Sequence, residues 1–172
     1  MSFFLAVDLD EPVRAVVAAC IERHRAEITA KWLRTDKLHV TLRFLGHPTA
    51  AELADLHPVV EAITREAQPF TLSLRGVGFF ATARAPSVVW LGVDGQLPQL
   101  HALQRALHPA DDRPFVPHVT LARAQTSGSL ERLEPALRGF TSPPFVIDHV
   151  TLYESTHEHY RPLFRCTLAG RG

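Results

Sequence analysis

Two kinds of hydrophobic pattern alternate along the chain. Runs of β-branched and aromatic residues predict strands at residues 3–9, 38–46, 70–80, 87–93, 144–153 and 160–168, with a further strand beginning at His118. Apolar residues at helical spacing predict helices capped by Asp10 and by Thr49, one opened by Pro98, and one over Leu130–Leu137. The order is strand, helix, strand, helix, hairpin, helix, strand, helix, hairpin. This order predicts a mixed α+β class.

Glycine and proline modify two of these elements. Gly76 and Gly78 indicate a bulge or bend in the strand at 70–80. Pro58 lies inside the second helix and is expected to kink or divide it. No Gly/Ser-rich linker separates the two halves of the chain, so residues 1–172 are expected to form a single domain.

Composition narrows the function classes. A hydrophobic content of 46% and a charged content of 21% are typical of an ordinary soluble globular protein. Lys+Arg and Asp+Glu balance at 18 each, so a phosphate-bearing partner must be held by a local site rather than by a broad basic face. Two cysteines exclude a disulfide framework and a four-thiolate zinc site. No signal peptide or transmembrane run is evident, so we expect a cytoplasmic protein that does not bind membranes.

The tetrapeptide HVTL occurs at residues 39–42, 118–121 and 149–152. In a strand, its His and Thr point to one face and its Val and Leu to the other. His39 follows a turn-like segment and His118 follows Pro117, so both are expected to begin their strands, where sites are built. His149 instead lies inside the predicted strand 144–153 and is interpreted as structural.

Arginines follow two of the copies. Arg123 comes five residues after His118, and alternation is expected to place Arg43 on the same face as His39 and Thr41. Two imidazoles, two hydroxyls and a guanidinium would meet the needs of metal-free cleavage of a cyclic phosphodiester. One imidazole takes a proton from water, the other gives a proton to the departing oxygen, and the donors hold the phosphoryl charge.

The motifs HVTLRFLG and PFVPHVTLAR resemble the paired His-x-Thr motifs of the two-histidine phosphoesterase superfamily. Within it, the chain is most similar to the bacterial RNA 2′,3′-cyclic phosphodiesterases, historically called 2′-5′ RNA ligases. The likeness extends to FFLAVDLDEPVR, VVWLGV and VTLYES…YRPL, and so covers nearly the whole chain. It implies a bilobal α+β fold, in which two pseudo-symmetric antiparallel sheets with helices outside flank a central cleft.

The resemblance also implies roles. The expected reaction is hydrolysis of an RNA or nucleoside 2′,3′-cyclic phosphate to a 2′-phosphate, without metal or other cofactor. His39 would be the general acid and His118 the general base, although sequence alone does not fix that direction. Thr41, Thr120 and Arg123 would bind the phosphate, with Arg43 as a further candidate. The expected partner is RNA or an oligonucleotide with a 2′,3′-cyclic phosphate, and the expected state is a monomer.

Three alternatives stay open. The three HVTL histidines could hold zinc, which accepts three imidazoles and water. The cleft could bind RNA ends without catalysis, although the ten Phe residues lie mostly in core patterns and no stacking platform is evident. The same cleft could also serve 2′-5′ ligation or another cyclic nucleotide. Five further histidines are expected on helices or turns at the surface, namely His24, His47, His57, His101 and His108.

Overall fold

The structure is a computed structural model that describes residues 2–80 and 87–169. Its strands are paired in antiparallel fashion. Its helices and strands confirm the predicted mixed α+β class. In chain order they are β1 (Ser2–Asp8), α1 (Glu11–Arg25), β2 (Ala30–Trp32), a 3₁₀ turn (Thr35–Lys37), β3 (His39–Gly46), α2 (Ala50–Arg65), β4 (Phe70–Phe80), β5 (Ser87–Gly95), α3 (Leu97–Leu107), β6 (His118–Ala124), α4 (Ser127–Leu137), β7 (Phe145–Ile147), β8 (His149–Ser155) and β9 (Tyr160–Thr167).

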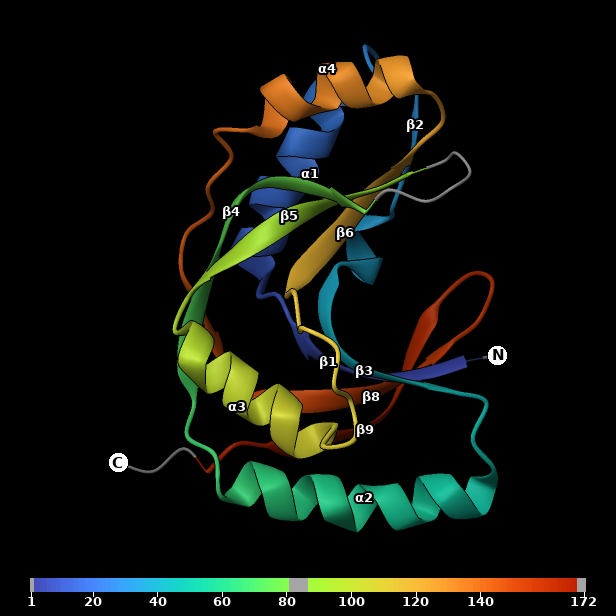
Figure 1. Cartoon of the computed structure of the whole chain (residues 1–172), viewed down its shortest axis with the longest axis vertical. Helices are drawn as coiled ribbons and strands as arrows, with labels where there is room; N and C mark the ends of the chain where they lie inside the picture. Colours follow the sequence, from blue (N-terminus) through green and yellow to red (C-terminus); the bar gives the residue numbers. More distant parts are fainter. Residues whose placement is uncertain (1, 81–86, 170–172) are drawn as a thin grey trace.

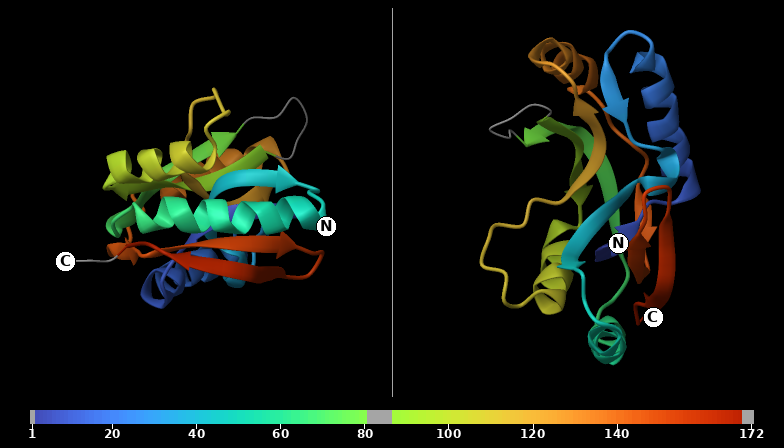
Figure 2. Two further views of the ribbon diagram at one scale, coloured as in Figure 1. Left: turned by 90° about the horizontal axis from the view of Figure 1, so that it is seen from below. Right: turned by 90° about the vertical axis from the view of Figure 1, so that its right-hand side faces the viewer.

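The strands form a strongly curled sheet in two halves (Figure 1). The strand order is β7-β4-β5-β6-β3-β1-β8-β9, with β2 paired to β6. In the described part of the chain, the halves are joined through one pair, Val40 of β3 with Val119 of β6. Figure 2 (right) shows β3 between the strands of the two halves. The bilobal arrangement is therefore confirmed, with the refinement that one residue pair joins the two antiparallel sheets into one.

The first two helices begin at their predicted caps, whereas α4 begins at Ser127, three residues before the predicted start. The Asp10 side chain accepts from the Val13 amide at 3.0 Å, and Thr49 forms a reciprocal capping box with Glu52. The expectation that Pro58 divides α2 is wrong, because the helix runs without interruption from residue 50 to residue 65. Packing against β9 and α3 supports α2 along this length, which compensates for the backbone hydrogen bond that proline removes.

The single strand predicted over 144–153 is wrong. It breaks at Asp148 into β7, which pairs with β4, and β8, which pairs with β1 and β9. The segment thus passes from one half of the sheet to the other. His149 is consequently the first residue of its strand, as His39 and His118 are of theirs. Its place inside a strand no longer distinguishes it from the other two copies.

The core fills the space between the sheet and its helices. Val40 and Val119 are both fully buried, as alternation predicts for the residue between His and Thr. The bend predicted in β4 is also present, since the β4–β5 register shifts between Leu74 and Val77, and Gly76 has a φ of 73° there. Across residues 2–80 and 87–169, no helix has the length and apolarity to span a membrane.

Candidate active site

The first two HVTL copies line one cleft of about 440 Å³ between the halves of the sheet. His39 and Thr41 come from β3, and His118 and Thr120 come from β6. Since Val40 pairs with Val119 in antiparallel register, His39 faces Thr120 across the strands and Thr41 faces His118. The sequence-predicted pairs are thus brought together with approximate twofold symmetry.

Each histidine is held by the same backbone device. The Nδ1 of His39 donates to the Lys37 carbonyl at 2.8 Å, and the Nδ1 of His118 donates to the Val116 carbonyl, also at 2.8 Å. A carbonyl only accepts, so each Nδ1 carries a proton and each Nε2 is the titrating nitrogen. The Nε2 of His39 lies 2.7 Å from the Thr41 hydroxyl, which donates to it when the ring is neutral.

Aromatic rings fix both imidazoles. Phe4 stacks on His39 at 4.7 Å between centroids, and Tyr160 meets the ring edge-on at 5.4 Å. Around His118, Phe80 lies edge-on at 4.8 Å and Trp90 lies tilted at 5.7 Å. Burial lowers the pKa of His39 to about 4, so this ring is neutral at pH 7 in the ligand-free protein.

A bulge follows each of the two His-x-Thr motifs and determines which of the next side chains face the cleft. The β1–β3 register shifts at Leu42, and the β5–β6 register shifts between Ala122 and Thr120. Each extra residue moves the following side chains to the opposite face. The residue three positions after each threonine therefore lines the cleft: Phe44 in β3 and Arg123 in β6.

Arg123 thus lines the cleft with Thr120, where simple alternation would have turned it away. The placement predicted for Arg43 is wrong for the same reason. Its side chain does not line this cleft, and its Nη1 donates to the Leu107 carbonyl of α3 at 2.9 Å. It lines an adjoining hollow of about 260 Å³ that shares Thr41 and His118 with the cleft.

The cleft carries positive charge in a chain of zero formal net charge. Its described lining includes four cationic side chains and no carboxylate: Lys31, Arg34, Lys37 and Arg123. Arg34 is paired with Asp36 at 3.1 Å. A local group of cations such as this is what a chain of balanced composition would need in order to hold a phosphate-bearing partner.

Most phenylalanines lie in or against the core, as expected, but two exposed rings border the cleft and the adjoining hollow. Phe44 is 72% exposed and borders both the cleft and the adjoining hollow. Phe80, at 37%, borders the hollow beside His118. Sequence reasoning missed these residues. Phe44 sits at the same position after its motif as Arg123, and comparing the two motifs could have found it.

The third HVTL copy belongs to a different cluster. The Nε2 of His149 contacts Asp8 at 2.8 Å, and its Nδ1 contacts Asp148 at 2.6 Å. Asp8 also accepts from the hydroxyls of Thr151 and Tyr153. Burial opposes ionisation of Asp8, but these hydrogen bonds outweigh it and lower its pKa, while the bond to Asp8 raises the pKa of His149.

Carboxylates on both ring nitrogens favour the charged form of His149, and its side chain does not line the cleft. Its structural role stays a prediction, now supported by these contacts rather than by its position in a strand. The three-histidine zinc site is not formed: within the described residues, no metal-ligand group includes His39, His118 or His149.

The chain belongs to the 2′-5′ RNA ligase superfamily, whose family model matches residues 10–159. The resemblance seen in the paired motifs is therefore confirmed, and with it the prediction that the protein falls in a class of enzymes. Three curated relatives named RNA 2′,3′-cyclic phosphodiesterase illustrate the match. The relative from Methanothermobacter thermautotrophicus is 34% identical over 76% of this chain and 74% of its own length. The Thermotoga maritima relative is 26% identical over 99% and 97%. The Geobacillus stearothermophilus relative is 29% identical over 91% of this chain, which spans about half (52%) of that protein.

Solved structures have the same fold over the whole chain. TT0787 of Thermus thermophilus aligns with a TM-score of 0.75 and 28% identity, covering 100% of both chains. E. coli LigT complexed with 3′-AMP aligns with a TM-score of 0.79 and 27% identity, covering 97% of both.

Proposed function

We propose that the protein hydrolyses the 2′,3′-cyclic phosphate of RNA or nucleosides to a 2′-phosphate by metal-free acid–base catalysis. The observation that carries the proposal is the pair of equivalent imidazoles on β3 and β6, each with its Nδ1 tied to a backbone carbonyl, in one basic cleft. The names of the curated relatives support this substrate class.

In the proposed reaction, the Nε2 of His118 accepts a proton from water as the water oxygen attacks phosphorus. The bond from phosphorus to the 3′-oxygen breaks, and the Nε2 of His39 gives that oxygen a proton. The hydroxyls of Thr41 and Thr120 donate to phosphate oxygens, and Arg123 supplies a fixed positive charge. This direction follows the family resemblance.

Substrate binding is part of this cycle. A general acid must be protonated, whereas burial keeps His39 neutral in the ligand-free protein, with a pKa of about 4. A phosphate anion next to His39 favours the charged ring and raises its pKa. The proposed acid is therefore formed when the negatively charged substrate enters the cleft.

A second function has one observation in its favour. Phe44 is 72% exposed at the cleft and offers a face on which a nucleobase can stack. A protein that only binds RNA ends, or one that joins 2′-5′ linkages or cleaves another cyclic nucleotide, would use the same surface. We place hydrolysis first because stacking alone gives no reason for two matched, tethered imidazoles.

Alanine variants of the three HVTL histidines test the proposal, with a nucleoside 2′,3′-cyclic phosphate as substrate. His39→Ala and His118→Ala are each expected to lower kcat by about 10²–10⁴-fold. His149→Ala, measured with a folding check by circular dichroism, is the matched control and should keep turnover. The wild type should also keep turnover in excess chelator.

Full activity in either of the first two variants would exclude the acid–base pair. Loss of activity in folded His149→Ala would overturn its structural interpretation. Saturable binding of phosphate-terminated RNA by the wild type without any turnover would favour the binding module.

A further inference from the structure

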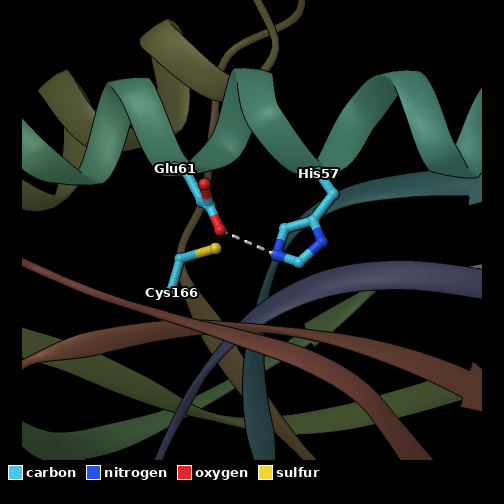
Figure 3. A group of neighbouring side chains, drawn as sticks. All are labelled: His57, Glu61 and Cys166. Carbon is cyan, nitrogen blue, oxygen red and sulfur yellow. Dashed lines mark ion pairs between the residues drawn. The ribbon is translucent and has the colours of Figure 1, made fainter.

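A cluster of metal-ligating side chains lies outside the cleft, between α2 and β9 (Figure 3). His57 and Glu61 lie one turn apart on α2, and Cys166 lies on β9. None of the three lines the cleft, and the proposed function uses none of them. The sequence predicts a surface position for His57, and its side chain is half-exposed on α2.

The three ligand atoms converge on one point. The Nε2 of His57 lies 3.1 Å from the Oε1 of Glu61. All three ligand atoms, including the Cys166 sulfur, lie within 4.8 Å of one another. Figure 3 shows the sulfur pointing from β9 toward the pair on the helix. In a tetrahedral zinc site, bonds of about 2.0–2.3 Å place the ligands roughly 3.3–3.8 Å apart. Small rotations of the half-exposed His57 and Glu61 side chains would close the remaining gap.

The imidazole is already oriented for such a site. His57 stacks on Phe164 with ring centroids 4.0 Å apart and an angle of 5° between the planes. Phe164 is two residues before Cys166, so both side chains leave β9 on the side that faces α2. Cys166 is only 4% exposed, which shields its sulfur from solvent on the sheet side. Packing thus places the ring and the sulfur on the facing sides of α2 and β9 before any ion binds.

The donor set identifies the class of ion. One imidazole nitrogen, one thiolate sulfur and one carboxylate oxygen suit a borderline divalent cation such as Zn²⁺, whereas Mg²⁺ and Ca²⁺ prefer oxygen ligands alone. Three protein ligands leave a fourth position for water. On binding, the Cys166 thiol gives its proton to solvent, and the charge of the ion is balanced by thiolate and carboxylate.

We propose that His57, Glu61 and Cys166 form a site for Zn²⁺ or a similar divalent cation that ties α2 to β9. An ordinary helix-surface ion pair above a buried thiol would account for part of the geometry, since Glu61 also lies 3.8 Å from Arg65. It would not account for the convergence of a sulfur from another element on the same pair. The ion is structural in this proposal, because the site lies outside the catalytic cleft.

Binding of Co²⁺ to tag-free, chelator-treated protein tests the proposal directly. The expected result is one equivalent bound, with a sulfur-to-cobalt charge-transfer band that Zn²⁺ displaces. Cys166→Ala should abolish the band, and Glu61→Gln should weaken binding at least about tenfold. Cys20→Ala is the matched control, because it removes the other cysteine, on α1, and should leave the band unchanged.

Thermal unfolding and activity complete the test. Zn²⁺ should raise the Tm of the wild type and of Cys20→Ala but not that of Cys166→Ala. Cys166→Ala should hydrolyse the cyclic phosphate at the wild-type rate, with or without chelator. Absence of saturable Co²⁺ binding, or a band that persists in folded Cys166→Ala, would overturn the site. Neither result would bear on the proposed hydrolysis.

Discussion

Two imidazoles with the same tether differ in their surroundings at the scale of single residues. Both donate from Nδ1 to a carbonyl two residues earlier, but His39 is packed beneath Phe4 and beside Tyr160, whereas His118 borders the adjoining hollow. Burial lowers the pKa of His39 to about 4, although the HVTL motif around it is the same as that around His118. The environments of two histidines in identical HVTL tetrapeptides can therefore favour different roles, one as acid and one as base.

The titration of His39 should depend on what occupies the cleft. In ligand-free protein its pKa should lie near 4, and a bound nucleoside 2′-phosphate should raise it, because the anion stabilises the charged ring. The proposed reaction needs one imidazole neutral and the other protonated, so kcat should depend on pH as a bell. NMR titration of the ring protons with and without ligand measures the shift. A pKa that stays near 4 in the complex would reverse the two roles.

Because the bulges place Arg123 in the cleft and Arg43 outside it, alanine substitutions of these two arginines should affect kinetics differently. Arg123→Ala should lower kcat/KM by about 10–100-fold, the effect of losing a hydrogen bond to a charged group. Arg43→Ala removes the same side chain from a residue tied to the Leu107 carbonyl, and should change kcat/KM much less. Steady-state kinetics on the cyclic phosphate compares them. A larger effect at Arg43 would contradict the placement that the bulges impose.

The sequence identified the four His and Thr side chains of the cleft because they precede the bulges. Alternation from a strand's first residue is reliable as far as Thr41 and Thr120. One inserted residue then inverts the positions that directly follow it, Arg43 and Phe44 in β3 and Ala122 and Arg123 in β6. Arg43 was therefore expected beside His39 and Thr41, whereas Phe44 lines the cleft and Arg43 lines the adjoining hollow. The inserted residues are ordinary apolar or small side chains, so nothing in the pattern announces them.

At the scale of elements, close contact between β4 and β5 fixes one histidine. Gly78 of β4 pairs with Trp90 of β5, and the indole ring lies across the glycine. A Cβ added at Gly78 would lie 2.3 Å from ring carbons of Trp90. The absence of a side chain at Gly78 thus leaves room for the Trp90 ring, which lies tilted beside His118.

Gly78→Ala should therefore displace Trp90 and, through it, His118. We expect a loss of about 1–3 kcal/mol in the free energy of unfolding and a fall in kcat of up to about 100-fold. Gly139→Ala is the control, because a Cβ there meets no atom within 4 Å. Urea unfolding and steady-state kinetics give both values. An unchanged kcat in Gly78→Ala would show that Trp90 does not position the ring.

The break at Asp148 shows where prediction of elements failed. The segment was read as one strand because both parts are rich in apolar and β-branched residues. The buried apolar positions nevertheless change from odd to even numbers at the break, with Phe145 and Ile147 in β7 and Val150 and Leu152 in β8. The partners of the two parts lie in different halves of the sheet. The caps at Asp10 and Thr49 depend on local signals and were predicted correctly, whereas the short strand β2 was missed.

At the scale of the whole molecule, charge is concentrated rather than spread. Four cations line the described cleft while the chain has 18 basic and 18 acidic residues. For a short oligonucleotide with a 2′,3′-cyclic phosphate, log KM should therefore change with log salt by a slope of about 3 at most, since each neutralised phosphate of a single strand contributes about 0.7. Kinetics across a series of salt concentrations measures it. A much steeper slope would require phosphate contacts beyond the cleft.

The twin bulges have a consequence for the polarity of the ligand. A tetrahedral phosphate presents similar oxygens on opposite sides, so two identical His-x-Thr segments could bind it in either of two orientations. The segments on β3 and β6 differ at the third residue after each threonine, which is the apolar Phe44 in β3 and the cationic Arg123 in β6. A nucleoside phosphate has a corresponding asymmetry, because it carries an aromatic base at one end and a charged phosphate at the other. On the proposed function, the duplicated scaffold provides the chemistry, and this unlike pair determines which ester oxygen faces the acid and which product isomer leaves.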